Sequence, residues 1–299
     1  MAQYSIKDLE RLSGIKAHTI RVWEQRYGVL KPKRTETNIR RYDDMELKLL
    51  LNLSQLIRHG GKISKLSRLS DDQLTKELEM VSDAVINPDD FYSIHIDKLI
   101  IAMLDFCEQK FEKVISVTTI KFGFDATMRY VLLPFLRKVG LMWQTGEINV
   151  AQEHFVTNLI RRKIIVAIDG LLIPEKDIRY ILYLPEGEFH ELGLLFAKYY
   201  FKSRGVRVLY LGQSVPLKDL KEAIKAYDPL GLFTFLTTPT SANSSEKYFD
   251  SLKQDFPKLQ ILVAGSQVSR LLNNPTKGVT YFNQIEEFVT YLDKKLHLN

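Results

Sequence analysis

Hydrophobic positions follow a helical period up to about residue 173 and a strand period after it. In the first part, apolar residues recur three or four positions apart, as in Ile6, Leu9 and Leu12, which indicates amphipathic helices. From Arg179 onward, the apolar runs YILYL, VRVLYL, LGLFTFL, LQILVAG and GVTYF alternate with helical stretches. Such alternation predicts a parallel sheet covered by helices on both faces. The chain is therefore expected to be multidomain, all-α first and α/β afterwards.

The first 82 residues predict a winged helix-turn-helix. Two short helices separated by a tight glycine-containing turn are typical of this motif, and the segment LKPKRTETNIRRYD indicates a basic hairpin, or wing. The expected elements, in order, are a helix capped by Ser5, a helix over His18–Tyr27, the wing, a helix that starts at Asp43, and a further helix over Ser64–Glu79.

Two further domains are expected. Asn87-Pro88-Asp89-Asp90 marks the first boundary. Residues 90–173 contain little glycine or proline and predict a four-helix bundle. Residues 178–299 predict a doubly wound, flavodoxin-like domain with a five-stranded parallel sheet.

Charge is distributed unevenly along this otherwise ordinary globular composition. Residues 1–70 carry 15 Lys and Arg against 7 Asp and Glu, whereas the remainder carries 27 against 29. A positive field confined to one small domain indicates a polyanionic partner there. The single cysteine, Cys107, excludes an intramolecular disulfide and a multi-cysteine zinc site. Because the longest apolar run spans only Leu99–Leu104 and no signal peptide is evident, a cytoplasmic protein without membrane contact is expected.

Basic and aromatic residues interleave in the predicted second helix and wing. A solvated basic face is the ordinary explanation of such a run, but here it coincides with the turn, the second helix and the hairpin of a DNA-binding motif. We therefore expect contacts to a double-stranded DNA operator. The expected contact residues are Arg21, Gln25, Arg26, Tyr27, Lys31, Arg34, Arg40, Arg41 and Tyr42.

The segment IRVWEQRYGVLKPKRTETNIRRYDD resembles the start of a MerR-type winged-helix transcription regulator. Those regulators carry an Ile-Arg-aromatic-aromatic-Glu run, a Gly-Leu-x-Pro-x-Arg step and a terminal Arg-Arg-Tyr. The resemblance covers about residues 4–58 and implies a homodimer that reads a pseudo-palindrome. It places Arg21 near bases, and Arg34 and Arg40 on phosphates.

The loop after the first predicted strand carries a candidate metal ligand. It reads Glu186-Gly187-Glu188-Phe189-His190-Glu191-Leu192-Gly193 and lies at the carboxyl end of the sheet, where doubly wound folds bind ligands. A carboxylate two residues before His190 can accept a hydrogen bond from one ring nitrogen and leave the other for a metal. From the residues alone, a plain surface pair is the competing interpretation.

Glu188-x-His190-x-x-Gly193 resembles the Asp-x-His-x-x-Gly motif of cobalamin-binding domains. In that family a Ser-x-Leu and a Gly-Gly pair follow at set distances, and the corresponding positions here are Thr234-Phe235-Leu236 and Ala264-Gly265. The resemblance implies that His190 is the axial ligand of cobalt. It also implies a cofactor site that contains Glu188, Gly193, Thr234, Leu236, Ala264 and Gly265.

Trp143, followed after nine residues by Glu153-His154, resembles a motif of adenosylcobalamin-dependent repressors of the light-sensing CarH/LitR type. Those repressors share the domain order predicted here. The resemblance implies that Trp143, Glu153 and His154 cover the adenosyl face of the cofactor. Alternatively, Trp143 is a core residue and Glu153-His154 a surface pair.

Four positions depart from the family patterns. Glu188 replaces Asp and Thr234 replaces Ser, so a carboxylate and a hydroxyl are retained. Ala264 replaces the first glycine of the pair beside which the nucleotide tail threads. Gln144 stands directly after Trp143, where light-sensing members commonly carry histidine.

The leading interpretation is a ligand-responsive DNA-binding regulator, most simply a repressor, whose homodimer or higher homo-oligomer is controlled by a corrinoid and by light. A second interpretation keeps DNA binding without a cofactor and assigns regulation to an antirepressor protein; Ala264 and Gln144 favour it. A third interpretation, a corrinoid methyl carrier, gives no function to the first 70 residues. No arrangement of nucleophile and base supports catalysis, so the chain is not expected to be an enzyme.

Overall fold

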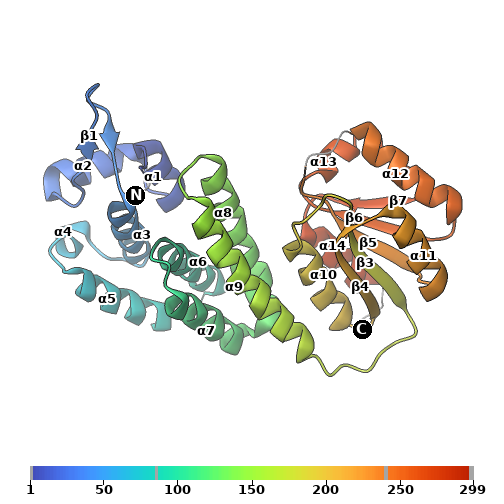
Figure 1. Ribbon diagram of the computed structural model, residues 1–299. Helices are drawn as coiled ribbons and strands as arrows, with labels where there is room; N and C mark the ends of the chain where they lie inside the picture. Colours follow the sequence, from blue (N-terminus) through green and yellow to red (C-terminus); the bar gives the residue numbers. More distant parts are fainter. Residues whose placement is uncertain (1–2, 85–86, 239–241, 296–299) are drawn as a thin grey trace. The chain divides into compact units, whose positions relative to one another are not determined.

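The structure, a computed structural model, describes residues 3–84, 87–238 and 242–295 (Figure 1). The chain divides into two compact units, Met1–Leu159 and Ile160–Asn299. The first holds the winged-helix elements and most of the helices that follow them, and the boundary falls within helix α9 (Val150–Asp169). None of the helices within the described ranges is long and apolar enough to cross a membrane.

The predicted helix-turn-helix and wing are confirmed. Ser5 and Asp8 form a reciprocal capping box, and Gly14 ends the first helix with φ 74°. Asp43 and Glu46 form a second capping box at the start of the third helix. The elements are α1 (Ile6–Ser13), α2 (Ala17–Tyr27), β1 (Lys33–Arg34), β2 (Arg40–Arg41) and α3 (Asp44–Arg58), with β1 and β2 paired antiparallel.

The prediction of a single helix over Ser64–Glu79 was wrong. The structure has two helices, α4 (Ile63–Leu66) and α5 (Asp71–Ala84). Ser70 interrupts the helical pattern because its hydroxyl accepts a hydrogen bond from the Gln73 amide (3.3 Å), while the Gln73 side chain accepts one from the Ser70 amide (2.9 Å). This reciprocal cap starts a new helix instead of continuing the old one.

The four-helix bundle predicted for the middle of the chain is confirmed. Its helices bury a shared aromatic and aliphatic core that includes Phe111, Val131 and Phe135. A π-helical turn, η1, precedes the third helix next to Pro134, which has no N–H to donate to the preceding turn. The elements are α6 (Pro88–Leu104), α7 (Glu108–Thr127), η1 (Met128–Leu132), α8 (Leu133–Gln144) and α9.

Within the first unit, the winged-helix elements dock on the bundle through contacts that include the following two. On α3, the Gln55 side chain donates to Ser93 Oγ of α6 (3.3 Å), and Arg58 Nη1 donates to the same atom (3.1 Å). On α1, Arg11 forms an ion pair with Glu147, which lies in the connection between α8 and α9. The Glu147 side chain is only 3% exposed, so this ion pair is largely withdrawn from water.

Glu147 is expected to make the stability of the first unit depend on pH. Burial, together with the neighbouring Asp8 carboxylate, raises the pKa of Glu147 from 4.5 to about 7 against the opposing effect of Arg11. Because the folded chain holds this proton more tightly than the unfolded chain, the stabilisation is complete below pH 4.5 and is lost as the pH rises through 7. A shift of this size corresponds to at most about 3 kcal/mol of unfolding free energy.

Denaturant titrations on either side of this pH range measure the effect. The unfolding free energy of the wild type should decline between pH 4.5 and 7. Glu147→Gln has no titrating proton at this position and should flatten that part of the profile. An equal decline in both proteins would contradict the assignment to Glu147.

The C-terminal unit is a five-stranded parallel sheet with strand order β4-β3-β5-β6-β7, which confirms the predicted doubly wound, flavodoxin-like fold. The five predicted strands all form. The elements are β3 (Arg179–Pro185), α10 (Leu192–Lys202), β4 (Arg207–Val215), α11 (Leu217–Tyr227), β5 (Gly231–Phe235), α12 (Ala242–Asp255), β6 (Gln260–Ala264), α13 (Val268–Leu271), β7 (Val279–Phe282) and α14 (Ile285–Lys295).

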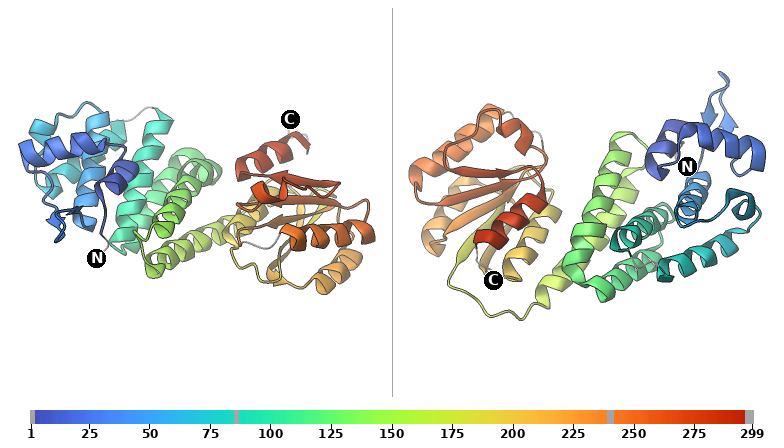
Figure 2. Two further views of the ribbon diagram at one scale, coloured as in Figure 1. Left: turned by 90° about the horizontal axis from the view of Figure 1, so that it is seen from above. Right: turned by 180° about the vertical axis from the view of Figure 1, so that it is seen from behind.

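Helices cover both faces of this sheet (Figure 2). On one face, α11 and α12 pack on residues such as Leu232 and Val263, and the Lys221 ammonium on α11 pairs with Asp255 at the end of α12 (2.6 Å). On the other face, α14 contributes Phe288, whose ring centroid lies 4.5 Å from that of Phe233. Because helices cover both faces of the sheet, the loops that follow the carboxyl ends of its strands remain accessible.

Candidate functional site: a histidine loop and a basic wing

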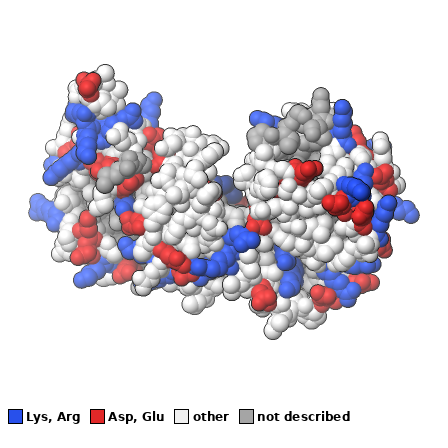
Figure 3. All heavy atoms as spheres, viewed as in Figure 1, with Lys and Arg blue, Asp and Glu red and all other residues white. Residues whose placement is uncertain are grey.

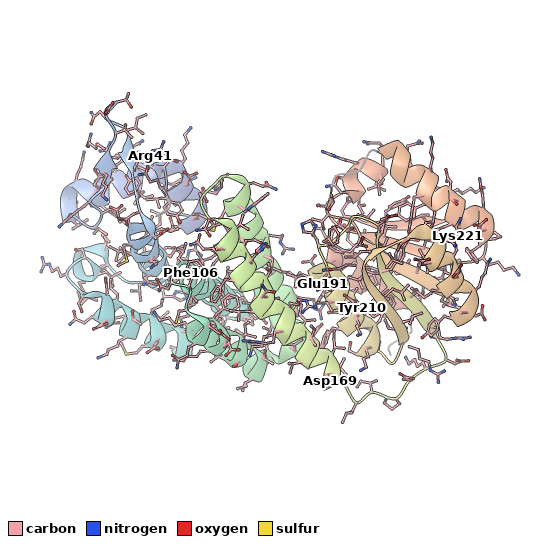
Figure 4. All side chains as sticks on the ribbon, viewed as in Figure 1. Arg41, Phe106, Asp169, Glu191, Tyr210 and Lys221 are labelled. Carbon is pink, nitrogen blue, oxygen red and sulfur yellow. The ribbon has the colours of Figure 1, made fainter. Side chains whose placement is uncertain are left out.

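The loop after β3 presents one imidazole to solvent. His190 has a side chain that is 63% exposed, and its Nδ1 lies 2.6 Å from Glu188 Oε1. The loop is fastened to β4, because Gln213 Nε2 donates to the Phe189 carbonyl (2.8 Å) and the Tyr210 hydroxyl donates to Glu191 (3.2 Å; Figure 4). His190 is therefore held by its own loop and by the neighbouring strand.

Glu188 is the buried anchor of this loop. Its Oε2 accepts hydrogen bonds from the Thr237 and Thr238 amides (2.7 Å each), and its Oε1 accepts bonds from the Thr238 hydroxyl (3.0 Å) and the His190 amide (3.1 Å). Burial alone would raise the pKa of Glu188. The donors from Thr238, Thr237 and His190 outweigh burial and lower the pKa to about 2.

This carboxylate determines the tautomer of His190. An ionised Glu188 can only accept a hydrogen bond, so the facing Nδ1 of His190 must carry a proton. In the neutral imidazole, Nε2 then has its lone pair free for a metal ion. The arrangement orients a single imidazole so that its Nε2 faces away from Glu188.

The other predicted cofactor residues of the C-terminal unit gather around the same edge. Thr234 and Leu236 lie at the end of β5, which pairs with β3, and Ala264 and Gly265 lie at the end of the next strand, β6. Thr234 is fully buried and its Oγ1 has no hydrogen-bond partner, whereas Ala264 is fully buried among core residues. An unpartnered buried hydroxyl beside the loop is a group that a ligand can satisfy.

Gly193 and Gly265 are required by close packing. A Cβ at Gly193 would lie 2.6 Å from the Phe235 ring. A Cβ at Gly265, where φ is +115°, would lie 2.3 Å from the Leu236 carbonyl oxygen. Gly193 thus lets the start of α10 approach the end of β5, and Gly265 lets the ends of β5 and β6 approach one another.

Gly265→Ala is expected to destabilise the C-terminal unit by about 3 kcal/mol, because it adds both backbone strain and a clash with a backbone oxygen. Gly140→Ala in α8 is the matched control: that glycine has no left-handed φ and nothing within 4 Å of a built Cβ. The control should be neutral or slightly stabilising. Denaturant unfolding of both variants measures the difference; equal stabilities would contradict the packing argument.

Trp143, Glu153 and His154 lie at one end of the helical hairpin formed by α8 and α9. Trp143 is 54% exposed, so the alternative that it is a core residue was wrong. His154 Nδ1 lies 2.6 Å from Glu153 Oε2, and the imidazole is largely exposed. The first unit thus presents an exposed indole and a second oriented imidazole.

The predicted DNA-contacting residues lie on α2 and the wing, where Figure 3 shows Lys and Arg side chains gathered. The exposed members are Arg21, Gln25, Arg26, Lys31 and Arg34. Tyr27 is partly buried with the Arg26 guanidinium 5.6 Å from its ring centroid, and Arg41, also partly buried, lies on β2 (Figure 4).

Tyr42 and Arg40 hold the wing against α2. Tyr42 is buried, which makes the prediction that it contacts DNA wrong: its ring packs in the core and its hydroxyl donates to Glu24 Oε2 (3.3 Å). Arg40 is half-buried, and its Nε donates to both Glu24 oxygens (3.1 Å each). The two side chains fix the angle between the wing and the second helix.

Sequence reasoning missed the contribution of Thr237 and Thr238. Their amides supply two of the hydrogen bonds that hold Glu188. The signal was available in the position of Thr237-Thr238 immediately after the Thr-x-Leu segment at the end of a strand. What could not be read was that their amides point at a carboxylate 49 and 50 residues earlier in the chain.

Comparison with known proteins agrees with the predicted domain types. The family model described as "MerR HTH family regulatory protein" matches residues 4–73, and the model described as "B12 binding domain" matches residues 95–167. The chain is 31% identical to the HTH-type transcriptional repressor CarH of Myxococcus xanthus over 88% of its own length and 89% of that protein. It is 29% identical to the HTH-type transcriptional repressor CarA of the same organism over 73% of its own length and 71% of that protein.

Among solved structures, the monomethylamine corrinoid protein of Methanosarcina barkeri superposes with a TM-score of 0.57. The match covers 67% of this chain and 98% of that protein at 14% identity, which shows a shared fold. The relatives matched over most of the chain are repressors and not enzymes, as expected from the sequence. The chain belongs to the family of transcriptional repressors, represented by CarH and CarA, that join a MerR-type helix-turn-helix to a B12-binding region.

Proposed function

We propose that this protein is a transcription repressor whose affinity for its operator is controlled by a cobalamin, with adenosylcobalamin as the specific ligand. One observation carries the proposal most directly: an exposed imidazole whose Nδ1 is held by an ionised carboxylate at the carboxyl edge of a doubly wound sheet. Membership of the CarH and CarA family supports both halves of the proposal.

The residues of the site suit a corrinoid. His190 would bind cobalt through Nε2, with Glu188 orienting the ring. Thr234 would form a hydrogen bond with the corrinoid through its buried, unpartnered hydroxyl. Gly265 keeps the ends of β5 and β6 close to each other. Trp143, Glu153 and His154 would cover the opposite face of the cofactor, as the resemblance implies.

When bound, adenosylcobalamin would supply a cobalt–carbon bond that light can break. The residues that touch the adenosyl group would then lose their contact. Operator affinity would change to the extent that the DNA-binding and non-binding states of the protein, as a homodimer or larger homo-oligomer, differ in affinity for the intact cofactor.

The test is a binding and spectroscopic experiment on the purified full chain. Incubation with adenosylcobalamin in the dark should yield a protein-bound visible spectrum after gel filtration. Operator affinity, measured by fluorescence anisotropy at fixed salt, should differ between ligand-free, dark and illuminated samples. Absence of bound corrinoid at micromolar concentrations would end the cofactor proposal.

Two outcomes separate the regulatory inputs. A cobalamin effect without a light effect would retain the ligand and exclude light as its trigger, consistent with Gln144 after Trp143. Operator binding unaffected by cobalamin or light would instead favour regulation by an antirepressor protein, consistent with the fully buried Ala264.

A further inference from the structure

The connection between α8 and α9, residues 145–149, is bound to the DNA-binding elements. The Arg11 guanidinium of α1 donates a hydrogen bond to the Glu147 carboxylate, with which it forms an ion pair, and it lies 3.4 Å from the Thr145 hydroxyl. The Tyr4 hydroxyl, which donates a hydrogen bond to Asp44 Oδ1 (2.8 Å), also lies 3.4 Å from the Glu147 carbonyl oxygen. Tyr4 is fully buried, so this is an internal contact of the first unit.

Further contacts lead from this junction to the surface expected to bind DNA. Tyr4 pairs with Tyr42 at the end of the wing through two backbone hydrogen bonds (2.8 and 3.0 Å). The Tyr42 hydroxyl donates to Glu24 of α2, and Glu24 also accepts from Arg40 of the wing. A displacement of Glu147 therefore acts on buried, hydrogen-bonded groups that set the position of the wing relative to α2.

The two ends of the same connection lead to the proposed cofactor contacts. Trp143 lies in the last turn of α8, and its carbonyl accepts from the Gly146 amide (3.1 Å). Glu153 lies in the first turn of α9. Only five residues separate the two helices, so the chain has little length in which to absorb a shift at either end.

We infer that residues 145–149 transmit the effect of cofactor binding to the DNA-binding elements. These residues are joined to α1 by the Arg11–Glu147 ion pair, and binding of the cofactor at Trp143, Glu153 and His154 would change operator affinity through them. Arg11 and Glu147 act as positioning residues: they touch neither DNA nor cofactor. This inference rests on the proposed function. It requires two arrangements of the connection with different operator affinities, between which the cofactor selects.

Arg11→Ala and Glu147→Ala test it in the full chain. The measured quantity is the ratio of operator dissociation constants with and without adenosylcobalamin in the dark. A wild-type ratio of about tenfold or more is expected, in the range usual for coupled sites, and it should fall close to one in either variant. The visible spectrum of the bound cofactor should not change, because neither residue contacts it.

Two further variants separate a specific role from general damage. The charge exchange Arg11→Glu with Glu147→Arg should restore part of the lost ratio. Arg58→Ala removes a hydrogen bond from α3 to Ser93 of α6 and one to the Ser13 carbonyl at the end of α1, both outside the connection, and should keep the wild-type ratio. Hydrogen exchange of the ligand-free proteins should rise at both α1 and residues 145–149 in the Arg11 and Glu147 variants alone.

The outcomes distinguish the two proposals. A wild type that binds no corrinoid overturns the proposed function and the inference with it. A wild type with a clear ratio, matched by ratios of the same size in Arg11→Ala and Glu147→Ala, overturns only the inference. If the ratio of operator dissociation constants also fell close to one in Arg58→Ala, any weakening of the contacts between the winged-helix elements and the bundle would abolish the cofactor effect. That result would also overturn the specific role of residues 145–149.

Discussion

His190→Ala is expected to weaken binding of adenosylcobalamin by about 100-fold or more. Loss of a hydrogen-bonding neighbour of a metal ligand commonly costs 10- to 100-fold in affinity, and removal of the ligand itself should reach at least the upper end of that range. The visible spectrum should change as well, because it depends on the axial ligand. Titration of the purified variant, followed by absorbance, measures both effects.

The side chain removed is more than half exposed, so the variant should fold normally. His18→Ala, another exposed histidine outside the site, should bind like the wild type. Free imidazole should restore part of the spectrum in His190→Ala, since it can occupy the vacated ligand position. If His190→Ala had the same affinity for adenosylcobalamin and the same visible spectrum as the wild type, His190 would not be a ligand of the metal.

Replacing Arg21 and Arg34 together by alanine is expected to weaken operator binding by about 100- to 1000-fold. Arg21 is exposed on α2, where a base contact contributes about 1–3 kcal/mol, and Arg34 is exposed on the wing, where a phosphate contact adds a further loss. Removal of one phosphate contact should also reduce the slope of affinity against salt by about one.

Single variants separate the two roles. Arg21→Ala should lower the preference for operator over unrelated DNA, whereas Arg34→Ala should weaken binding to both about equally. Arg270→Ala removes an exposed arginine of the C-terminal unit and should leave ligand-free operator binding unchanged. Anisotropy titrations at several salt concentrations measure all four proteins. If the double variant kept wild-type affinity, α2 and the wing would not be the DNA-binding surface.

The local elements could be predicted because the determinants are local. Ser5 and Asp43 start helices through side chains that reach only three residues along the chain, and the strand runs of the C-terminal unit are short and strongly apolar. The failure over Ser64–Glu79 has the same origin. Ser70 fits the helical period of polar positions, yet its hydroxyl caps the following helix.

The candidate site could be predicted only in part because its supporting contacts span large sequence separations. His190 and Glu188 are two residues apart and were identified from spacing. Their anchors, Thr237 and Thr238, lie just after β5, the strand that pairs with β3 in the sheet. Similarly, Tyr42 resembles a surface aromatic in a basic run, and only its pairing with Tyr4 at the other end of the motif shows that it is buried.

The anchoring of Glu188 has a consequence for the speed and strength of ligand capture. A flexible histidine must give up rotational freedom at the moment it coordinates, and that loss subtracts from affinity. Here the ring is oriented during folding, by contacts that exist before any ligand arrives. Less of the coordination free energy would therefore be lost to ordering the ring, which would favour retention of the cofactor proposed for this site.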